Sequence, residues 1–136
     1  MANDINILIL SCGTRNKIVQ YFKKELDGIG QVMATDCSEL APALYDADKH
    51  FIVPRMNEEG YLDVILSICK ENNIKAVLSL IDPELNLLAV HKQDFLDIGT
   101  TPIISDWEAV EMCFNKYSMY EFLIQNGFKA AKCYID

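Results

Sequence analysis

Short apolar runs alternate along this chain with segments in which apolar residues recur at helical spacing. Runs of the first kind predict buried strands, and helical spacing predicts amphipathic helices. The expected strands are 5–10, 31–35, 50–53, 76–81 and 102–104. The expected helices are 17–26, 60–72, one starting near 82, one after 105, and 116–126. Because strands and helices alternate, and the strands are continuously apolar, we expect an α/β fold with a parallel sheet covered by helices on both faces.

Polar residues beside these segments predict where the helices begin. Asp82 is expected to be the N-cap of its helix, since its carboxylate can accept hydrogen bonds from free amides. Ser105 and Glu108 have the spacing of a capping box, in which each side chain bonds the backbone at the other position. A further strand is expected to begin at 131–135.

The turn after the first strand, "SCGTR", lies where a nucleotide-binding fold would hold phosphate. A dinucleotide fingerprint needs three glycines, and only Gly13 is present, although Asp36 follows the second strand where a ribose-binding carboxylate would lie. Two interpretations of the turn remain open. Free amides at the helix start could hold an anion together with Arg15. Alternatively, Thr14 or Asn16 caps the helix and Arg15 points into water.

Composition narrows the class of protein. The net charge of −8 argues against nucleic acid as a partner, because binding nucleic acid requires basic patches. No run of 18 apolar residues and no signal peptide is visible, so we expect no membrane contact. Five cysteines are widely spaced, no C-x-x-C occurs, and His50 and His91 are far from a ligand spacing, so we expect no metal site. Reduced thiols fit a cytoplasmic protein.

Three motifs occur in order along the chain: "SCGTR", "SLIDPEL" and "NKYSMYEFLIQNGFKAAKCYI". Together with "TDCSELAPALYDADKHFIVPR" they resemble the amino-terminal part of an ATP-grasp ligase of the carbamoyl-phosphate-synthase-like group. The resemblance implies a Rossmann-like pre-ATP-grasp domain at 1–110 and the start of a truncated ATP-grasp domain at 111–136. In the full-length protein it implies ATP and Mg²⁺ as cofactors, a small-molecule carboxylate as substrate, and an acyl phosphate that an amine attacks.

The resemblance also implies particular site residues. Those on the substrate side are Gly13, Arg15, Asp36, Ser38, Asp82 and Glu84. Lys116 matches a basic residue that reaches the nucleotide phosphates; the family often has aspartate before it, whereas this chain has Asn115, an equally good but uncharged cap. Asp82 and Glu84 also have a structural interpretation, as a helix cap and as a complement to the helix dipole. No catalytic residue and no metal ligand is expected before Asp136.

The sequence favours the substrate-side domain of a ligase, which alone would be inactive and would hold no tightly bound cofactor. Two other functions remain open. One is a Rossmann-type dinucleotide-binding module. The other is a non-catalytic interaction or regulatory domain, which could form a homodimer through an uncovered apolar face.

Overall fold

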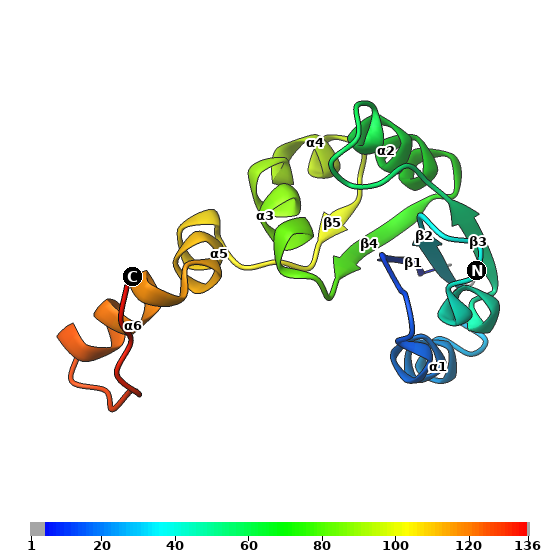
Figure 1. The fold of residues 1–136 in the computed structure, drawn as a ribbon. Helices are drawn as coiled ribbons and strands as arrows, with labels where there is room; N and C mark the ends of the chain where they lie inside the picture. Colours follow the sequence, from blue (N-terminus) through cyan, green and yellow to red (C-terminus); the bar gives the residue numbers. More distant parts are fainter. Residues whose placement is uncertain (1–4, 136) are drawn as a thin grey trace.

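A computed structural model describes residues 5–135 of the chain. Its strands are β1 (Asn6–Leu10), β2 (Val32–Asp36), β3 (Lys49–Ile52), β4 (Ile74–Ser79) and β5 (Thr101–Pro102). Its helices are α1 (Asn16–Glu25), the 3-10 helix η1 (Pro42–Asp46), α2 (Tyr61–Glu71), α3 (Asp82–Val90), α4 (Lys92–Asp97), α5 (Trp107–Phe114) and α6 (Lys116–Gln125) (Figure 1). All five strands expected in the first 104 residues are present, and no strand end differs from its expected position by more than two residues.

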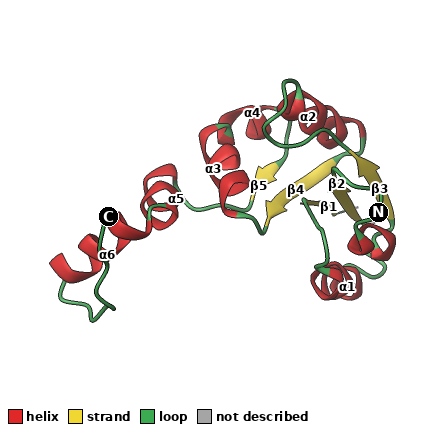
Figure 2. Cartoon of the chain, in the orientation of Figure 1, coloured by secondary structure: helices red, strands yellow, loops and turns green. Residues whose placement is uncertain are grey.

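The strands form one sheet in the order β3-β2-β1-β4-β5, and every neighbouring pair is parallel (Figure 2). The expected Rossmann-like α/β fold is therefore confirmed. The chain moves outward in one direction from β1 to β3 and then returns to the other side of β1 with β4. In parallel α/β sheets, this reversal of strand order opens a crevice at the carboxyl ends of the two central strands. The loops after β1 and β4 meet at that point.

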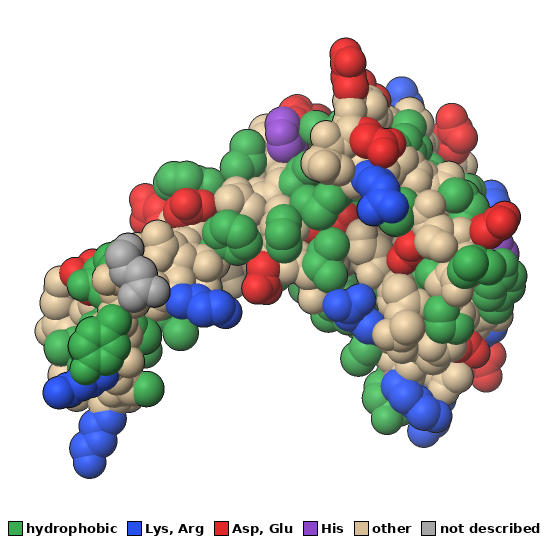
Figure 3. All heavy atoms as spheres, viewed as in Figure 1, with side chains coloured by type: hydrophobic (Ala, Val, Ile, Leu, Met, Phe, Trp, Pro, Cys, Tyr) green, Lys and Arg blue, Asp and Glu red, His purple; other side chains and the backbone are tan. Residues whose placement is uncertain are grey.

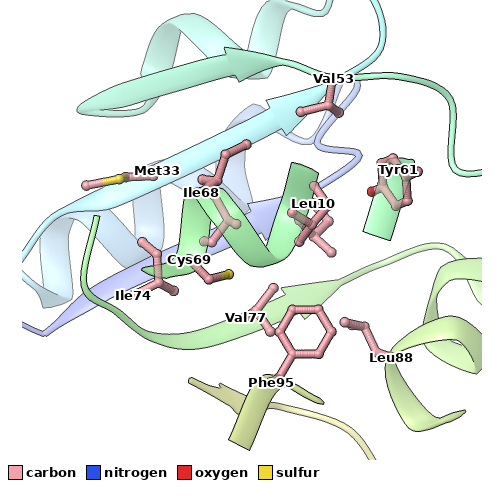
Figure 4. Packing of buried hydrophobic residues seen from close by; sticks show 12 residues of the cluster. Leu10, Met33, Val53, Tyr61, Ile68, Cys69, Ile74, Val77, Leu88 and Phe95 are labelled. Carbon is pink, nitrogen blue, oxygen red and sulfur yellow. The ribbon is translucent and has the colours of Figure 1, made fainter. Parts of the chain in front are cut away.

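Apolar side chains cover both faces of the sheet, which explains why the strands are continuous apolar runs. Successive side chains in a strand point to opposite faces. Leu8 and Leu10 of β1 pack under α2, α3 and α4, in a cluster that includes the fully buried Phe95 (Figure 4). Ile7 and Ile9 belong to a second cluster, formed with α1 and η1 on the other face. The sheet is thus enclosed between two helical layers.

Helices α5 and α6 extend away from the sheet (Figure 1). Helix α5 packs against α3, where the Asn86 side-chain amide donates to Glu111 Oε2 at 3.0 Å. No residue of α6 is buried, and Phe122 remains 44% exposed. The strand expected at 131–135 is wrong: these residues have no regular structure. A strand needs a neighbour to pair with, and none of the strands of residues 5–135 lies beside this segment.

Two expected helix caps are also wrong. Helix α3 includes Asp82 as its first residue, because Ile81, whose backbone is extended, occupies the N-cap without a side-chain hydrogen bond. Helix α5 begins at Trp107 with Asp106 at the N-cap, so Ser105 lies one residue too early to form a capping box. Within residues 5–135, no helix combines the length and the apolar character needed to cross a membrane.

Candidate substrate site at the carboxyl edge of the sheet

The turn between β1 and α1 is tightly wound. Ser11 and Gly13 both have positive φ angles, of 45° and 50°. Few residues other than glycine adopt this conformation, so Ser11 is held there by its surroundings. Between them, the buried Cys12 donates its backbone N–H to Thr35 O at 3.0 Å. The backbone of the turn is therefore fixed against the end of β2.

Arg15 folds back over this turn. Its Nη1 lies 3.4 Å from Ser11 O, and a Cβ placed on Gly13 would come within 3.2 Å of the same nitrogen. Arg15 is partly buried and occupies the N-cap position of α1, but no side chain makes a capping hydrogen bond to the first amides of this helix. The interpretation in which Thr14 or Asn16 caps α1 is therefore wrong.

Asp36 ties the end of β2 to the turn after β1. Its Oδ2 accepts the Gly13 N–H at 2.9 Å, and its Oδ1 accepts the Ser38 N–H at 3.0 Å. In a dinucleotide site, the amides of this first turn approach the pyrophosphate. Here a carboxylate of the chain itself bonds the Gly13 amide and adds negative charge where a phosphate would lie. This arrangement counts against dinucleotide binding.

Glu84 is wholly buried, although its motif lies at the ligand edge of the sheet. Its carboxylate accepts hydrogen bonds from three hydroxyls: Ser11 at 3.0 Å, Ser79 at 2.5 Å, and Tyr61. These partners come from the turn after β1, the end of β4 and the start of α2. Glu84 therefore joins its own helix, α3, to these three segments at the point where the strand order reverses.

Asp82, two residues earlier, is exposed and lines a small pocket of about 190 Å³ between α3 and α5.

Sequence reasoning missed Tyr61, the first residue of α2. Burial, followed by the negative charge of Glu84 and the hydrogen bond to it, raises the pKa of the Tyr61 hydroxyl well above its usual value. The hydroxyl therefore stays protonated and donates to Glu84. Twenty-three residues separate the two, and no local spacing signals their contact.

A cleft of about 280 Å³ opens at this edge. Its lining residues come from the loops after β1, β2, β3 and β4: Ser11, Asp36, Cys37, Val53, Pro54, Arg55, Met56, Asn57 and Ile81. Seven site residues were expected from the sequence, and Asp36 is the one among them that lines this cleft. Gly13 and Ser38 adjoin it through their bonds to Asp36. Arg55 was not among the expected residues, although the rarity of arginine in the chain is a signal that could have singled it out.

Helices α5 and α6 form an arm that extends away from the sheet, and Lys116, the first residue of α6, lies on this arm, away from the cleft (Figure 1). It begins α6 after Asn115, whose side chain accepts from the amides of Tyr117 and Ser118 at 3.1 Å, so the expected cap is confirmed. Lys116 and Lys129 line a pocket of about 430 Å³ with apolar walls. The two lysines place positive charge beside an apolar surface. No group of three or more His, Cys, Asp or Glu side chains within residues 5–135 is placed to hold a metal ion.

The two buried thiols are poor nucleophiles. Burial and the charge of Asp36 raise the pKa of Cys12 to about 11, and burial raises the pKa of Cys69 to about 12. Thiolate, the reactive form, is therefore scarce at both positions near neutral pH.

Residues 7–103, more than half of the chain, match the family model described as PylC-like, N-terminal domain. The chain belongs to this family of amino-terminal domains, and the resemblance to a pre-ATP-grasp domain of ATP-grasp ligases is confirmed. A search of curated proteins found no match.

Solved structures share the fold. The L-amino acid ligase from Bacillus licheniformis superposes with a TM-score of 0.71 at 18% identity, covering 96% of this chain and 31% of that one. The biotin carboxylase subunit of pyruvate carboxylase gives 0.66 at 19% identity, covering 93% and 28%. N5-carboxyaminoimidazole synthetase from Staphylococcus aureus, complexed with ADP, gives 0.65 at 15% identity, covering 97% and 32%. The chain thus spans about a third of the length of these proteins.

Proposed function

We propose that this chain is the substrate-side amino-terminal domain of an ATP-grasp carboxylate–amine ligase, similar to the large subunit of carbamoyl-phosphate synthase. The observation that carries the proposal is the cleft at the carboxyl edge of the sheet, whose walls include a carboxylate, Asp36, and a guanidinium, Arg55. In the full-length protein, ATP would convert the bound acid to an acyl phosphate, and an amine would then displace the phosphate.

The chain would contribute binding and positioning to this reaction. Gly13, Arg15, Asp36 and Ser38 shape the loops around the acid, while Glu84 holds these loops from inside. Asp82 is exposed near α5 and would face a neighbouring domain. Magnesium would not be held by this chain, because residues 5–135 offer no cluster of side chains that could bind a metal ion. Its ligands would come from the catalytic lobes, so the chain alone should turn over no ATP and hold no cofactor tightly.

The shape of the molecule supports a position beside catalytic lobes. The space-filling view shows a broad concave side between the α5–α6 arm and the sheet, with basic side chains on both flanks (Figure 3). Strand β4 points its carboxyl end toward this concave side (Figure 1). We propose that a nucleotide held by ATP-grasp lobes lies here, with Lys116 near its phosphates. The family match ends at 103, and the proposed ATP-grasp domain begins near 111, within α5.

The arm also supports a proposal about partners. Its exposed apolar residues include Phe114, Met119, Phe122, Ile124 and Phe128. We propose that the catalytic lobes cover this surface in the full-length protein, and that in the isolated chain it drives homodimer formation. Sedimentation velocity should show a concentration-dependent dimer, which Phe122→Ser weakens.

A cytoplasmic location is proposed from the five cysteines, which are all unpaired.

Two assays on the 136-residue chain separate the ligase proposal from its alternatives. We expect no release of ADP from Mg-ATP with any added acid, and a flat calorimetric titration with NAD or NADP. The full-length gene product, in contrast, should release ADP when a suitable acid and amine are supplied. ATP turnover by the 136-residue chain, or saturable binding of a dinucleotide, would contradict the proposal.

A further inference from the structure

The chain has only two arginines, and both lie at the carboxyl edge of the sheet. Twelve basic residues are present in total, and Arg15 and Arg55 are the only ones that are not lysine. Arg15 follows β1 and Arg55 follows β3, and these strands run parallel in one sheet. The planar guanidinium matches a carboxylate through two parallel hydrogen bonds, which an ammonium group cannot form. Arginine is thus confined to the edge where ligands bind in this type of fold.

The guanidinium of Arg55 has no acidic partner among the described residues. The ion pairs within residues 5–135 are Lys23–Asp48, His91–Asp94 and Lys92–Asp106. The nearby Glu58 carboxylate instead accepts the backbone N–H of Arg55 at 3.2 Å. Although the chain carries 20 acidic residues, an arginine in its cleft remains available to an external anion.

The backbone that carries Arg55 is fixed. Val53 is only 7% exposed, and its N–H donates to Asp36 O at 3.0 Å. The ring of Pro54 fixes its own φ and restricts the preceding Val53, and Glu58 N–H donates to Arg55 O at 2.9 Å. A binding group on an ordered turn loses less conformational freedom when it meets its ligand. The charge of Arg55 is therefore presented to the cleft from a prepared position.

Asp36 lines the same cleft and restricts which anions suit it. Each of its carboxylate oxygens accepts one backbone amide, and each retains capacity for a further hydrogen bond. A simple anion on Arg55 would gain nothing from Asp36 and would be repelled by it. An acid that also carries a hydrogen-bond donor would satisfy both side chains.

We propose that Arg55 binds the carboxylate of a small acid whose neighbouring carbon carries a hydroxyl or ammonium group, and that Asp36 accepts a hydrogen bond from that group. This inference rests on the proposed ligase function and deepens it, because it names two side chains that would select the acid. Arg55 and Asp36 then act as specificity-determining residues.

The test is a set of ¹H–¹⁵N NMR titrations of the 136-residue chain with propionate, L-lactate and L-alanine. The three probes share a three-carbon skeleton and differ in the group next to the carboxylate. Lactate and alanine should shift the amides of Ser11, Cys37 and Asn57 saturably, and propionate should bind about fivefold more weakly. Arg55→Gln should weaken lactate and alanine binding about tenfold. The spectra themselves report whether each variant is folded.

Matched variants make the outcome specific. Lys24→Gln removes the same charge from an exposed position on α1 and should leave every titration unchanged. Arg55→Lys keeps the charge but loses the planar fork, and should bind with intermediate affinity. Undiminished binding by Arg55→Gln, or no saturable shift with any probe, would overturn the role of Arg55. Propionate binding as tightly as lactate would overturn the role of Asp36. ATP turnover by the full-length gene product would still support the ligase function in either case.

Discussion

At the scale of single residues, Glu84 is the junction of the carboxyl edge. Its buried carboxylate accepts hydroxyl hydrogen bonds from Ser11, Tyr61 and Ser79. The bond to Ser11 helps to hold a non-glycine residue at positive φ, which in turn shapes the turn beside the cleft. Because Glu84 is wholly buried, we propose that it positions the turn and does not contact the substrate.

Glu84→Gln should destabilise the fold, because an amide nitrogen cannot accept a hydroxyl hydrogen bond and one buried hydroxyl loses its partner. We expect a loss of about 1–3 kcal/mol in the free energy of unfolding, measured by urea denaturation. Glu71→Gln is the control, since Glu71 is exposed at the end of α2 and should cost less than about 0.5 kcal/mol. Equal stability of the two variants would show that the buried network contributes nothing.

Thiol reactivity should divide the cysteines into two groups. Cys12 and Cys69 are buried and have raised pKa values, whereas Cys37, Cys113 and Cys133 are exposed. With iodoacetamide at pH 8, mass spectrometry should find three fast alkylations in the native chain and five after unfolding in urea. Rapid native labelling of Cys12 would mean that the turn after β1 opens readily.

At the scale of elements, we propose separate roles for the loops at the carboxyl edge and for the helix α6. The loops after β1, β2 and β3 are joined by backbone hydrogen bonds and share one cleft. Helix α6 is capped by Asn115, packs against α5 and contributes no buried residue. Substitutions on α6 should therefore change the affinity for the proposed nucleotide more than they change the stability of the fold.

Lys116→Ala in the full-length protein should weaken ATP binding about tenfold, because a charged contact to phosphate is lost. The stability of the 136-residue chain should change by less than about 0.5 kcal/mol, since Lys116 is exposed. Isothermal titration with ATP measures the first effect, and Lys24→Ala on α1 serves as the charge control. Unchanged ATP affinity would remove Lys116 from the nucleotide site.

Much of this element structure could be predicted from sequence. The strands were found because both faces of the sheet are covered, which leaves continuous apolar runs. Helix α4 was missed, since six residues are too few to show a helical period. The contact between Tyr61 and Glu84 could not be predicted, because it depends on how α2 and α3 cross the same sheet face. Arg55 was missed for a different reason: it ends one of the stretches that carry the resemblance, but only the scarcity of arginine marks it as a binding residue.

At the scale of the whole molecule, the two buried thiols make the free energy of unfolding depend on pH in the alkaline range. In the unfolded chain they ionise near their ordinary pKa of 9.0, and in the folded chain only near 11 and 12. Above pH 9 the folded state therefore binds more protons than the unfolded state, and its stability falls as the pH rises from 9 towards 11. Tyr61 acts in the same direction above its ordinary pKa of 10.0.

We expect the free energy of unfolding, measured with urea, to be constant from pH 7 to 8.5 and to fall between pH 9 and 11, by up to about 1.4 kcal/mol per pH unit for each thiol. A Cys12→Ala, Cys69→Ala double variant should start less stable but show a shallower decline. A midpoint that is equal at pH 8 and pH 10.5 would contradict the raised pKa values.

The proposed ligase function is tested most directly by the coding sequence beyond the codon for Asp136, read together with the intact mass of the native gene product. We predict a continuation of about 300 residues with acidic metal ligands, because the chain spans about a third of the length of the similar ligases, and a product heavier than 15.4 kDa. A stop codon directly after Asp136, with a native mass of 15.4 kDa, would contradict the ligase function and favour a non-catalytic module.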